Sequence, residues 1–258
     1  DESHVLKSHK TERTKAAQRI AANAKRILLL SGTPALSRPI ELFSQLTLIN
    51  RNFVKIHDYG LRYCEAKKTA FGWDYQGSSN TKELQQLLKC LFVLRRLKTD
   101  VLTQLPDRIR QVVMLDPELI KKGTKEMEAM AANLKRESLK GLEKHAELLR
   151  YYSESSKQRL NAVGAYVKDL IDKNQKFIIF AHHQCVLDKI SEVLDKSKVR
   201  YIRIEGKTGA DQRKNYVDQF QKRDDCLVAV LSITAANSGI TLTAASFVVF
   251  AELYWNPA

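Results

Sequence analysis

The sequence has 258 residues, of which 44% are hydrophobic, so it can form about one or two domains with a sizeable core. It contains no run of the ~18 apolar residues that a membrane span needs, and we expect no membrane association. Lys and Arg outnumber Asp and Glu by 43 to 29, and this net charge of +14 favours a polyanionic partner, most often nucleic acid.

The first part of the chain predicts one strand and then mostly helices. Residues 25–30 form a basic-then-apolar run that leads into the sequence SGTP. Residues 40–101 are typical of helices, interrupted by the polar, glycine-containing stretch 71–80. Residues 109–115 are a second strand candidate. We expect a first domain at 1–117.

The charged region that follows predicts a helical hairpin leading into the second domain, 118–258. It covers residues 118–174, and scattered leucines serve as its apolar anchors. These leucines are Leu134, Leu142, Leu148 and Leu149.

From residue 176 onwards, short apolar runs alternate with amphipathic helical patterns. This alternation predicts βαβ units and a parallel sheet covered by helices on both faces, an α/β fold. Ligands of such sheets gather at the carboxyl ends of the strands. The expected strands are 176–183, 199–206, 225–233 and 246–253, and the expected helices are 184–198 and 210–223.

Two short motifs near the beginning of the chain are typical of a nucleotide site. Asp1 and Glu2 could hold Mg²⁺ and orient an attacking water, and His4 follows closely. Ser31 and Thr33 offer hydroxyls immediately after the first expected strand. Either motif alone is also explained by a solvated surface or a plain turn, but together they favour a functional site.

Two patterns in the second domain are weaker. His182, His183 and Cys185 lack a fourth zinc ligand, so contact with phosphate by an imidazole or by neighbouring backbone amides is more plausible. The sequence Gly206-Lys207-Thr208 resembles part of a phosphate loop, but Tyr201 stands where that loop needs glycine. This stretch could still bind a phosphate of another ligand. The cysteines, which have no paired spacing, indicate reduced thiols in an intracellular protein.

In this order, the motifs resemble the Swi/Snf-type ATPase branch of the superfamily-two helicases. "DESH" is similar to motif II, "LLLSGTP" to motif III and "FIIFAHH" to motif IV. "LRRLKTDVLTQLP" is similar to the segment that closes the first lobe, and "IRIEGKTGADQR" and "LSITAANSGITLTAASFVVFAELYWNP" to the later motifs. "GLRYCEAKK", "FGWDYQGSSN" and "ELYWNP" are most similar to the HepA-related annealing-helicase subgroup. Ala236 and Asn237 in place of paired glycines, and Glu252 in place of Asp, depart from most of the family but are similar to this subgroup.

The resemblance implies two RecA-like lobes with helical protrusions, the first lobe lacking its phosphate loop. It places that loop before Asp1 and an arginine-bearing motif after Ala258, so the chain alone is expected to be inactive. The implied activity is that of a nuclear, DNA-dependent ATPase that binds ATP and Mg²⁺, rewinds DNA and remodels stalled forks in DNA repair. Forked and junction DNA, bound without sequence preference, would be its partner, and a single-strand-binding protein could bind through other domains.

The resemblance also implies roles for individual residues. Asp1, Glu2 and His4 would be catalytic, with Asp1 and Glu2 holding Mg²⁺, and Gly239 would approach the nucleotide. Residues expected to couple nucleotide and DNA are Ser31, Thr33 and Trp255. Residues expected to contact DNA are Thr33, His182, Gly206, Lys207, Thr208, Ser232 and Thr234.

Two alternatives to the annealing helicase stay open from the sequence. One is a nucleosome-sliding motor of the same family, which flanking domains would distinguish. The other is a DNA-binding scaffold without catalysis, against which the intact Asp1, Glu2 and His4 argue.

Overall fold

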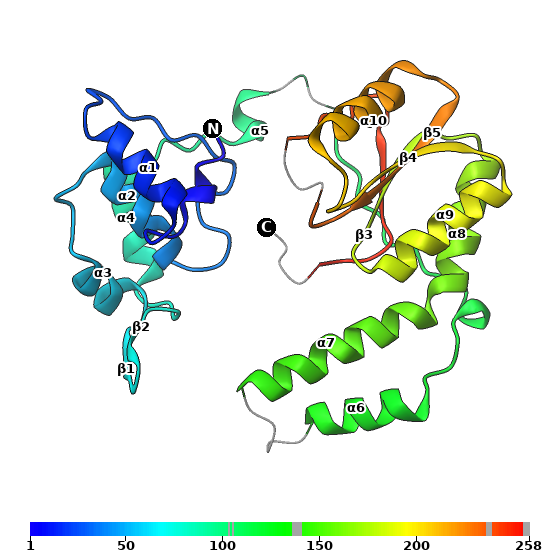
Figure 1. The fold of residues 1–258 in the computed structure, drawn as a ribbon, viewed down its shortest axis with the longest axis horizontal. Helices are drawn as coiled ribbons and strands as arrows, with labels where there is room; N and C mark the ends of the chain where they lie inside the picture. The colour runs from blue at the N-terminus through cyan, green and yellow to red at the C-terminus, as the bar shows by residue number, and fades with distance from the viewer. Residues whose placement is uncertain (103, 105, 136–140, 236–238, 255–258) are drawn as a thin grey trace. The chain divides into compact units, whose positions relative to one another are not determined.

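The computed structural model describes residues 1–102, 104, 106–135, 141–235 and 239–254, without the side chain of residue 142. The chain divides into two compact units at Ile109 and Arg110, here called unit 1 and unit 2 (Figure 1). The domain limits expected from the sequence, 1–117 and 118–258, stay a prediction about the functional lobes.

Unit 2 contains a four-stranded parallel sheet with the order β4-β5-β3-β6. The predicted α/β class is confirmed, and each of the four expected strands forms. The strands are apolar because a parallel sheet is buried on both faces. They are β3 (Phe177–Ala181), β4 (Arg200–Ile204), β5 (Cys226–Ser232) and β6 (Phe247–Phe250).

Helices cover both faces of this sheet (Figure 1). On one face, α8 (Leu160–Asp172) and α9 (Gln184–Lys196) pack Val167 and Ile190 against alternate residues of β3 and β5. On the other face, α10 (Ala210–Lys222) buries Phe220 among residues of β4 and β5. The two cores leave the carboxyl ends of the strands as a rim of polar loops.

The predicted helical hairpin is confirmed in the charged region. It consists of α6 (Lys125–Lys135) and α7 (Gly141–Gln158), which extend away from the sheet (Figure 1). Its buried apolar side chains include Met127 and Met130, whereas Leu149 is exposed. The anchor assigned to Leu149 was therefore wrong, because this leucine lies on the solvent face of α7.

Unit 1 is mainly helical, as predicted for residues 40–101. Its core gathers Phe43, Leu46, Tyr59, Tyr63 and Leu84. The Tyr59 hydroxyl donates to the carbonyl of Pro39 at 2.8 Å, which satisfies the polar end of a fully buried ring. The helices are α1 (Glu12–Ala21), α2 (Ile40–Ile49), α3 (Ile56–Tyr63), α4 (Thr81–Leu91) and the short α5 (Lys98–Val101).

The two strands expected at residues 25–30 and 109–115 do not form. Neither segment contains strand structure or pairs with a strand, so the prediction was wrong at both places. A strand needs a neighbouring backbone to complete its hydrogen bonds, and in the described part of unit 1 the strands are paired only with each other. Consequently Leu28 is 88% and Leu30 61% exposed.

The polar stretch that interrupts the helices of unit 1 contributes to an antiparallel hairpin, which the sequence did not predict. Strands β1 (Lys67–Thr69) and β2 (Gly72–Asp74) pair Thr69 with Gly72 across a two-residue turn. Gly72 has a φ of +117°, a conformation that only glycine adopts without strain. Nearby, a Cβ on Gly60 would stand 2.2 Å from the ring of Tyr75, so the hairpin packs directly on the α3 backbone.

Two further features concern membrane-spanning helices and the cysteines. No helix in the described residues is long and apolar enough to cross a membrane. The four cysteines are free thiols, of which Cys64 and Cys226 are buried and Cys90 is exposed.

Candidate functional site

The two short motifs of unit 1 are held against each other. Ser3, which is buried, donates its backbone N–H to the carbonyl of Leu30 at 2.9 Å and its hydroxyl to Gln45 Oε1 at 2.9 Å. A turn of 3-10 helix at Ser3–Leu6 then presents His4 towards Ser31. The segment that precedes α1 is thus held against the segment that follows it.

One imidazole nitrogen connects these motifs. His4 Nδ1 lies 3.2 Å from Glu2 Oε2 and 3.3 Å from Ser31 Oγ, and the Thr33 backbone N–H donates to Ser31 Oγ at 3.2 Å. A single ring nitrogen either carries a proton and donates to the carboxylate or lacks one and accepts from the hydroxyl. Glu2, His4, Ser31 and Thr33 therefore form a continuous polar chain in which Glu2 and Ser31 compete for His4 Nδ1.

The carboxylates of Asp1 and Glu2 are exposed. The Glu2 backbone N–H donates to Asp1 Oδ1 at 2.9 Å, and Glu2 itself has the left-handed φ of 51°. Mg²⁺ in proteins is commonly bound by one or two carboxylates together with waters and substrate phosphates. Among the described residues no cluster of three or more potential metal ligands occurs, so this pair of carboxylates fits Mg²⁺ only in that shared mode.

In unit 2, the strand-end loops are joined to one another by hydrogen bonds to backbone carbonyls. The backbone N–H of Ile233, after β5, donates to the carbonyl of Ala181, the last residue of β3, at 3.0 Å. The Arg213 guanidinium of α10 donates to the carbonyls of Glu205 at 3.2 Å, Thr208 at 3.0 Å and Ala235 at 2.9 Å. Arg213 thereby fixes the loop after β4 to the loop after β5.

Sequence analysis predicted no role for Arg213, although this residue lies in the stretch IRIEGKTGADQR. An arginine at a helix start is usually read as a solvated charge. Its spacing from Thr208 was the signal available, since a residue on the first turn of a helix can reach the loop that precedes that helix.

The predicted DNA-contacting residues of the loop after β4 lie close together. Thr208 Oγ1 accepts from the Glu205 backbone N–H at 2.9 Å, which closes the turn before α10. Lys207 is 81% exposed, with its Nζ 3.5 Å from Glu205 Oε2. A Cβ on Gly206 would meet nothing within 4 Å, so the fold itself does not require glycine there.

An ion-pair network lies under this loop. Arg203 contacts Glu205 Oε1 and also donates to Asp188 at 2.6 Å and to Ser191 Oγ at 2.9 Å. The hydrogen bond from Arg203 holds the pKa of the Asp188 carboxyl below its usual range. The network holds the buried Glu205 side chain between Arg203 and Lys207, so Lys207 is not an isolated cation on this loop.

The loop after β5 carries two neighbouring hydroxyls. Ser232 Oγ and Thr234 Oγ1 are 3.3 Å apart, and Ser232 is buried. Gly239 has a φ of +73°, and a Cβ there would meet nothing within 4 Å. Residues 236–238, which include Ala236 and Asn237 in place of the paired glycines, lie outside the described residues, as does Trp255.

Glu252, which the sequence analysis noted only as a departure from the family's Asp, binds the backbone at the end of β3. Its Oε2 accepts from the backbone N–H groups of His182 at 2.8 Å and His183 at 2.7 Å, and its Oε1 lies 2.7 Å from His183 Nδ1. The carboxylate is 3% exposed and caps the start of α9 from the end of β6. The backbone amides that we considered for phosphate binding are therefore already occupied.

The His182 ring is packed among aromatic side chains. It stacks on Tyr152 with centroids 6.1 Å apart and lies 4.8 Å from Tyr254, while the Tyr152 hydroxyl donates to the Leu253 carbonyl. Burial, and then the neighbouring His183, lower the pKa of His182, whereas Glu252 acts in the opposite direction. This ring is held as a neutral, half-buried group.

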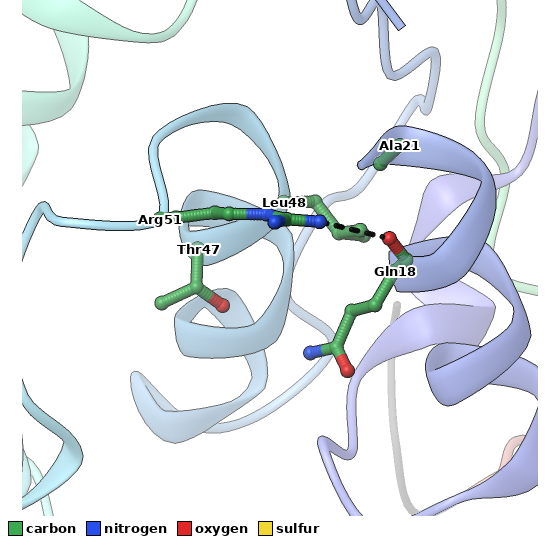
Figure 2. A pocket seen from close by; sticks show the side chains of 5 residues that line it. All are labelled: Gln18, Ala21, Thr47, Leu48 and Arg51. Atoms are coloured by element: carbon green, nitrogen blue, oxygen red, sulfur yellow. Dashed lines mark hydrogen bonds between the residues drawn. The ribbon is translucent and has the colours of Figure 1, made fainter. Parts of the chain in front are cut away.

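A separate cavity of about 300 Å³ lies in unit 1 between α1 and α2. It is lined by Gln18, Ala21, Thr47, Leu48 and Arg51, and Arg51 Nη2 donates to the Gln18 carbonyl at 3.3 Å (Figure 2). The Thr47 hydroxyl donates within its own helix, to the Phe43 carbonyl at 3.0 Å. With no acid or imidazole in its lining, this cavity offers no acid–base chemistry.

Comparison with known proteins identifies relatives along the whole chain. It is 48% identical to the SWI/SNF-related matrix-associated actin-dependent regulator of chromatin subfamily A-like protein 1 of Drosophila melanogaster, and 41% identical to the DNA annealing helicase and endonuclease ZRANB3 of Homo sapiens. Both alignments include 100% of this chain but only 34% and 25% of those relatives, so the chain spans about a third of their length or less.

A solved structure and two family models also match. The Sulfolobus solfataricus SWI2/SNF2 ATPase core in complex with dsDNA aligns with 100% of this chain and 57% of its own, at 22% identity and a TM-score of 0.47. Residues 159–258 match the helicase conserved C-terminal domain, and residues 1–162 match the SNF2-related domain. The family predicted from the motifs is thus confirmed, and the chain belongs to the SNF2-related family.

Proposed function

We propose that the chain is the part of a nuclear, ATP-driven DNA translocase that carries motif II and the strand-end loops of the second lobe, and that the complete protein rewinds DNA at stalled forks. Two relatives support this, since one is named a DNA annealing helicase and the other a regulator of chromatin. The positive net charge of +14 supports a nucleic-acid partner independently.

The polar chain from Glu2 to Thr33 carries the proposal. At its start, Asp1 and Glu2 would hold Mg²⁺, and Glu2 would orient water; ATP would supply the phosphoryl group when bound. His4 Nδ1 then donates to Glu2 or accepts from Ser31, according to the state of the carboxylate. Because Ser31 also accepts from the Thr33 backbone, a change at Glu2 reaches the residue proposed to contact DNA.

The rim of unit 2 would contact DNA through its phosphates. Lys207 provides an exposed cation after β4, Thr208 adds a hydroxyl next to it, and Ser232 and Thr234 provide hydroxyls at the end of the neighbouring strand β5. Hydroxyl and ammonium groups bind phosphate oxygens without reading base edges, so binding would not depend on sequence. Gly239, with open space at its Cα, would let the backbone approach the nucleotide.

The test of this proposal is the Glu2→Gln variant of the complete protein. The substitution keeps the side chain's shape and removes the charge that orients water, so ATP turnover should fall by about 100-fold or more while DNA binding stays within about twofold. Glu12→Gln is the matched control, because Glu12 is an exposed acid on α1 whose ion pair is with Lys15, at 2.7 Å. Turnover of Glu2→Gln within a few-fold of the parent would refute the assignment and favour the scaffold.

DNA binding itself has a separate test. The affinity of the chain for duplex DNA should fall steeply with salt, with a slope of about −0.9 in log K against log salt for each phosphate neutralised. Binding that ignores salt, or that discriminates strongly between sequences of equal shape, would contradict a phosphate-contacting rim.

A further inference from the structure

The tip of the β1–β2 hairpin in unit 1 exposes aromatic side chains. Phe71, in the two-residue turn, is 102% exposed, and Trp73 on β2 is 44% exposed. A single exposed apolar residue needs no explanation. Two large aromatic rings on one short hairpin, in a chain otherwise rich in charge, form a small apolar surface that is available to a partner.

This hairpin is fixed to the helix beneath it. The Trp73 ring meets the His57 ring edge-on with centroids 4.7 Å apart, and His57 Nδ1 lies 3.2 Å from the Tyr75 hydroxyl. Tyr75 in turn lies directly over Gly60, where no Cβ would fit. The aromatic surface is therefore presented on a supported ribbon, which lowers the entropy lost when a partner binds.

The turn is also closed by local hydrogen bonds. The Thr69 hydroxyl donates to the Gly72 carbonyl at 2.7 Å and accepts from the Phe71 backbone N–H at 3.3 Å. These bonds, together with the positive φ of Gly72, determine the path of the chain around Phe71 and leave its ring in solvent.

Positive charge lies beside the rings. Lys68 stands directly opposite Trp73 in the β1–β2 register, so the two side chains share one face of the ribbon. Lys67, on the other face, pairs with Glu65 at 2.9 Å. No ion pair engages Lys68 within the described residues, so its ammonium is available to an external anion.

We propose that the hairpin tip binds unpaired nucleotides, with a base stacked on Phe71 and the adjoining phosphate at Lys68. Aromatic rings beside cations bind single strands in this way, with little dependence on sequence. The inference extends the proposed function, because it adds a contact for the unpaired arm of a fork to the phosphate contacts of the rim. The net charge of +14 favours a nucleic acid over an apolar protein partner.

The experiment compares the affinity of the chain for a labelled fork with one unpaired arm and for a blunt duplex of equal length. Phe71→Ala should weaken fork binding by about fivefold or more and change duplex binding by less than about twofold. Phe71→Trp should keep fork binding, since the larger ring still stacks. Lys68→Ala should lower the salt slope on the fork by about 0.7. Leu94→Ala, another exposed apolar residue of unit 1, is the matched control and should change neither.

Several results would overturn the proposal. Equal losses on fork and duplex, or full retention by Phe71→Ala, would refute stacking while leaving DNA binding by the rim intact. A parent chain that binds neither DNA would refute this inference and the proposed function together. Binding to phosphatidylserine vesicles that depends on Phe71, with DNA binding unaffected, would assign the hairpin to a lipid surface instead. Unchanged unfolding midpoints of all variants show that each comparison is between folded proteins.

Discussion

The candidate site segments of the two units are held in different ways. In unit 2, the polar loops leave the ends of paired strands and are fixed by two charged groups, the half-buried Arg213 and the buried Glu252. In unit 1, the segment before Ser31 is unpaired, and its register depends on the bonds of Ser3 and His4. The difference shows that polar site residues can be positioned either by a sheet or by a few side-chain hydrogen bonds. In the second arrangement, the loss of one hydrogen bond should displace the site residues more.

The largest contrast is expected in the apolar residues. Phe220→Ala removes a fully buried ring from unit 2 and should destabilise it by about 3–5 kcal/mol. Leu28→Ala removes a side chain that is 88% exposed and should change the free energy of unfolding by about 0.5 kcal/mol or less. Urea unfolding followed by circular dichroism measures both. A large effect of Leu28→Ala would show that residues 25–30 are packed after all.

Removing the buried carboxylate of unit 2 should have the next largest effect. Glu252→Ala leaves the amides of His182 and His183 without their acceptor, at a cost of about 2–3 kcal/mol. Glu252→Gln keeps one acceptor oxygen and should cost less. Amide hydrogen exchange at the start of α9 locates the effect, and equal costs for both variants would argue against the capping role.

In unit 1, the corresponding change is smaller in free energy but closer to the site. Ser3→Ala removes the hydroxyl that donates to Gln45 and should cost about 1 kcal/mol. Because the segment has few other restraints, nuclear magnetic resonance shifts of Ser31 and Thr33 should move as well. Shifts confined to residue 3 and its immediate neighbours would contradict the coupling between the two motifs.

The smallest expected effect is a dependence on pH in unit 2. The pKa of His182 is lowered in the folded state, chiefly by burial, so the unfolded chain takes up the proton first as pH falls below about 6.5. Stability should therefore decline from that pH down to the folded pKa and then level off. Between about pH 7.5 and about pH 5.5, His182→Gln should lose less of its thermal midpoint than the parent. Identical losses would show that other groups, such as His9, whose pKa is also lowered, dominate.

The sequence was sufficient for the elements whose apolar pattern is local. Strands such as β5 are continuous apolar runs, and α9 repeats its buried residues at helical spacing, so both were predicted at nearly their observed limits. The strand expected at residues 25–30 failed for a reason outside the segment, because a strand also needs a partner. Local pattern cannot supply that information.

In the candidate site, too, local motifs were predicted, whereas contacts with distant partners were not. The resemblance grouped Glu2 with Ser31, and the structure brings them to one imidazole. The roles of Arg213 and Glu252 were not predicted because each depends on a partner distant in sequence. For Arg213 this partner is the Ala235 carbonyl, and for Glu252 it is the amides of His182 and His183. The hairpin was missed because Lys67, Lys68 and Asp74 obscure the alternation that normally marks a strand.

The contact between Gly60 and Tyr75 has a consequence for sequence variation. Since a Cβ at position 60 would stand 2.2 Å from the Tyr75 ring, residue 60 cannot become larger while Tyr75 keeps its place. Relatives that carry alanine or a larger residue at position 60 should also carry a smaller residue at position 75, or a hairpin of different length. The two positions should therefore covary through evolution, and a relative that breaks this pairing would be expected to hold its hairpin differently.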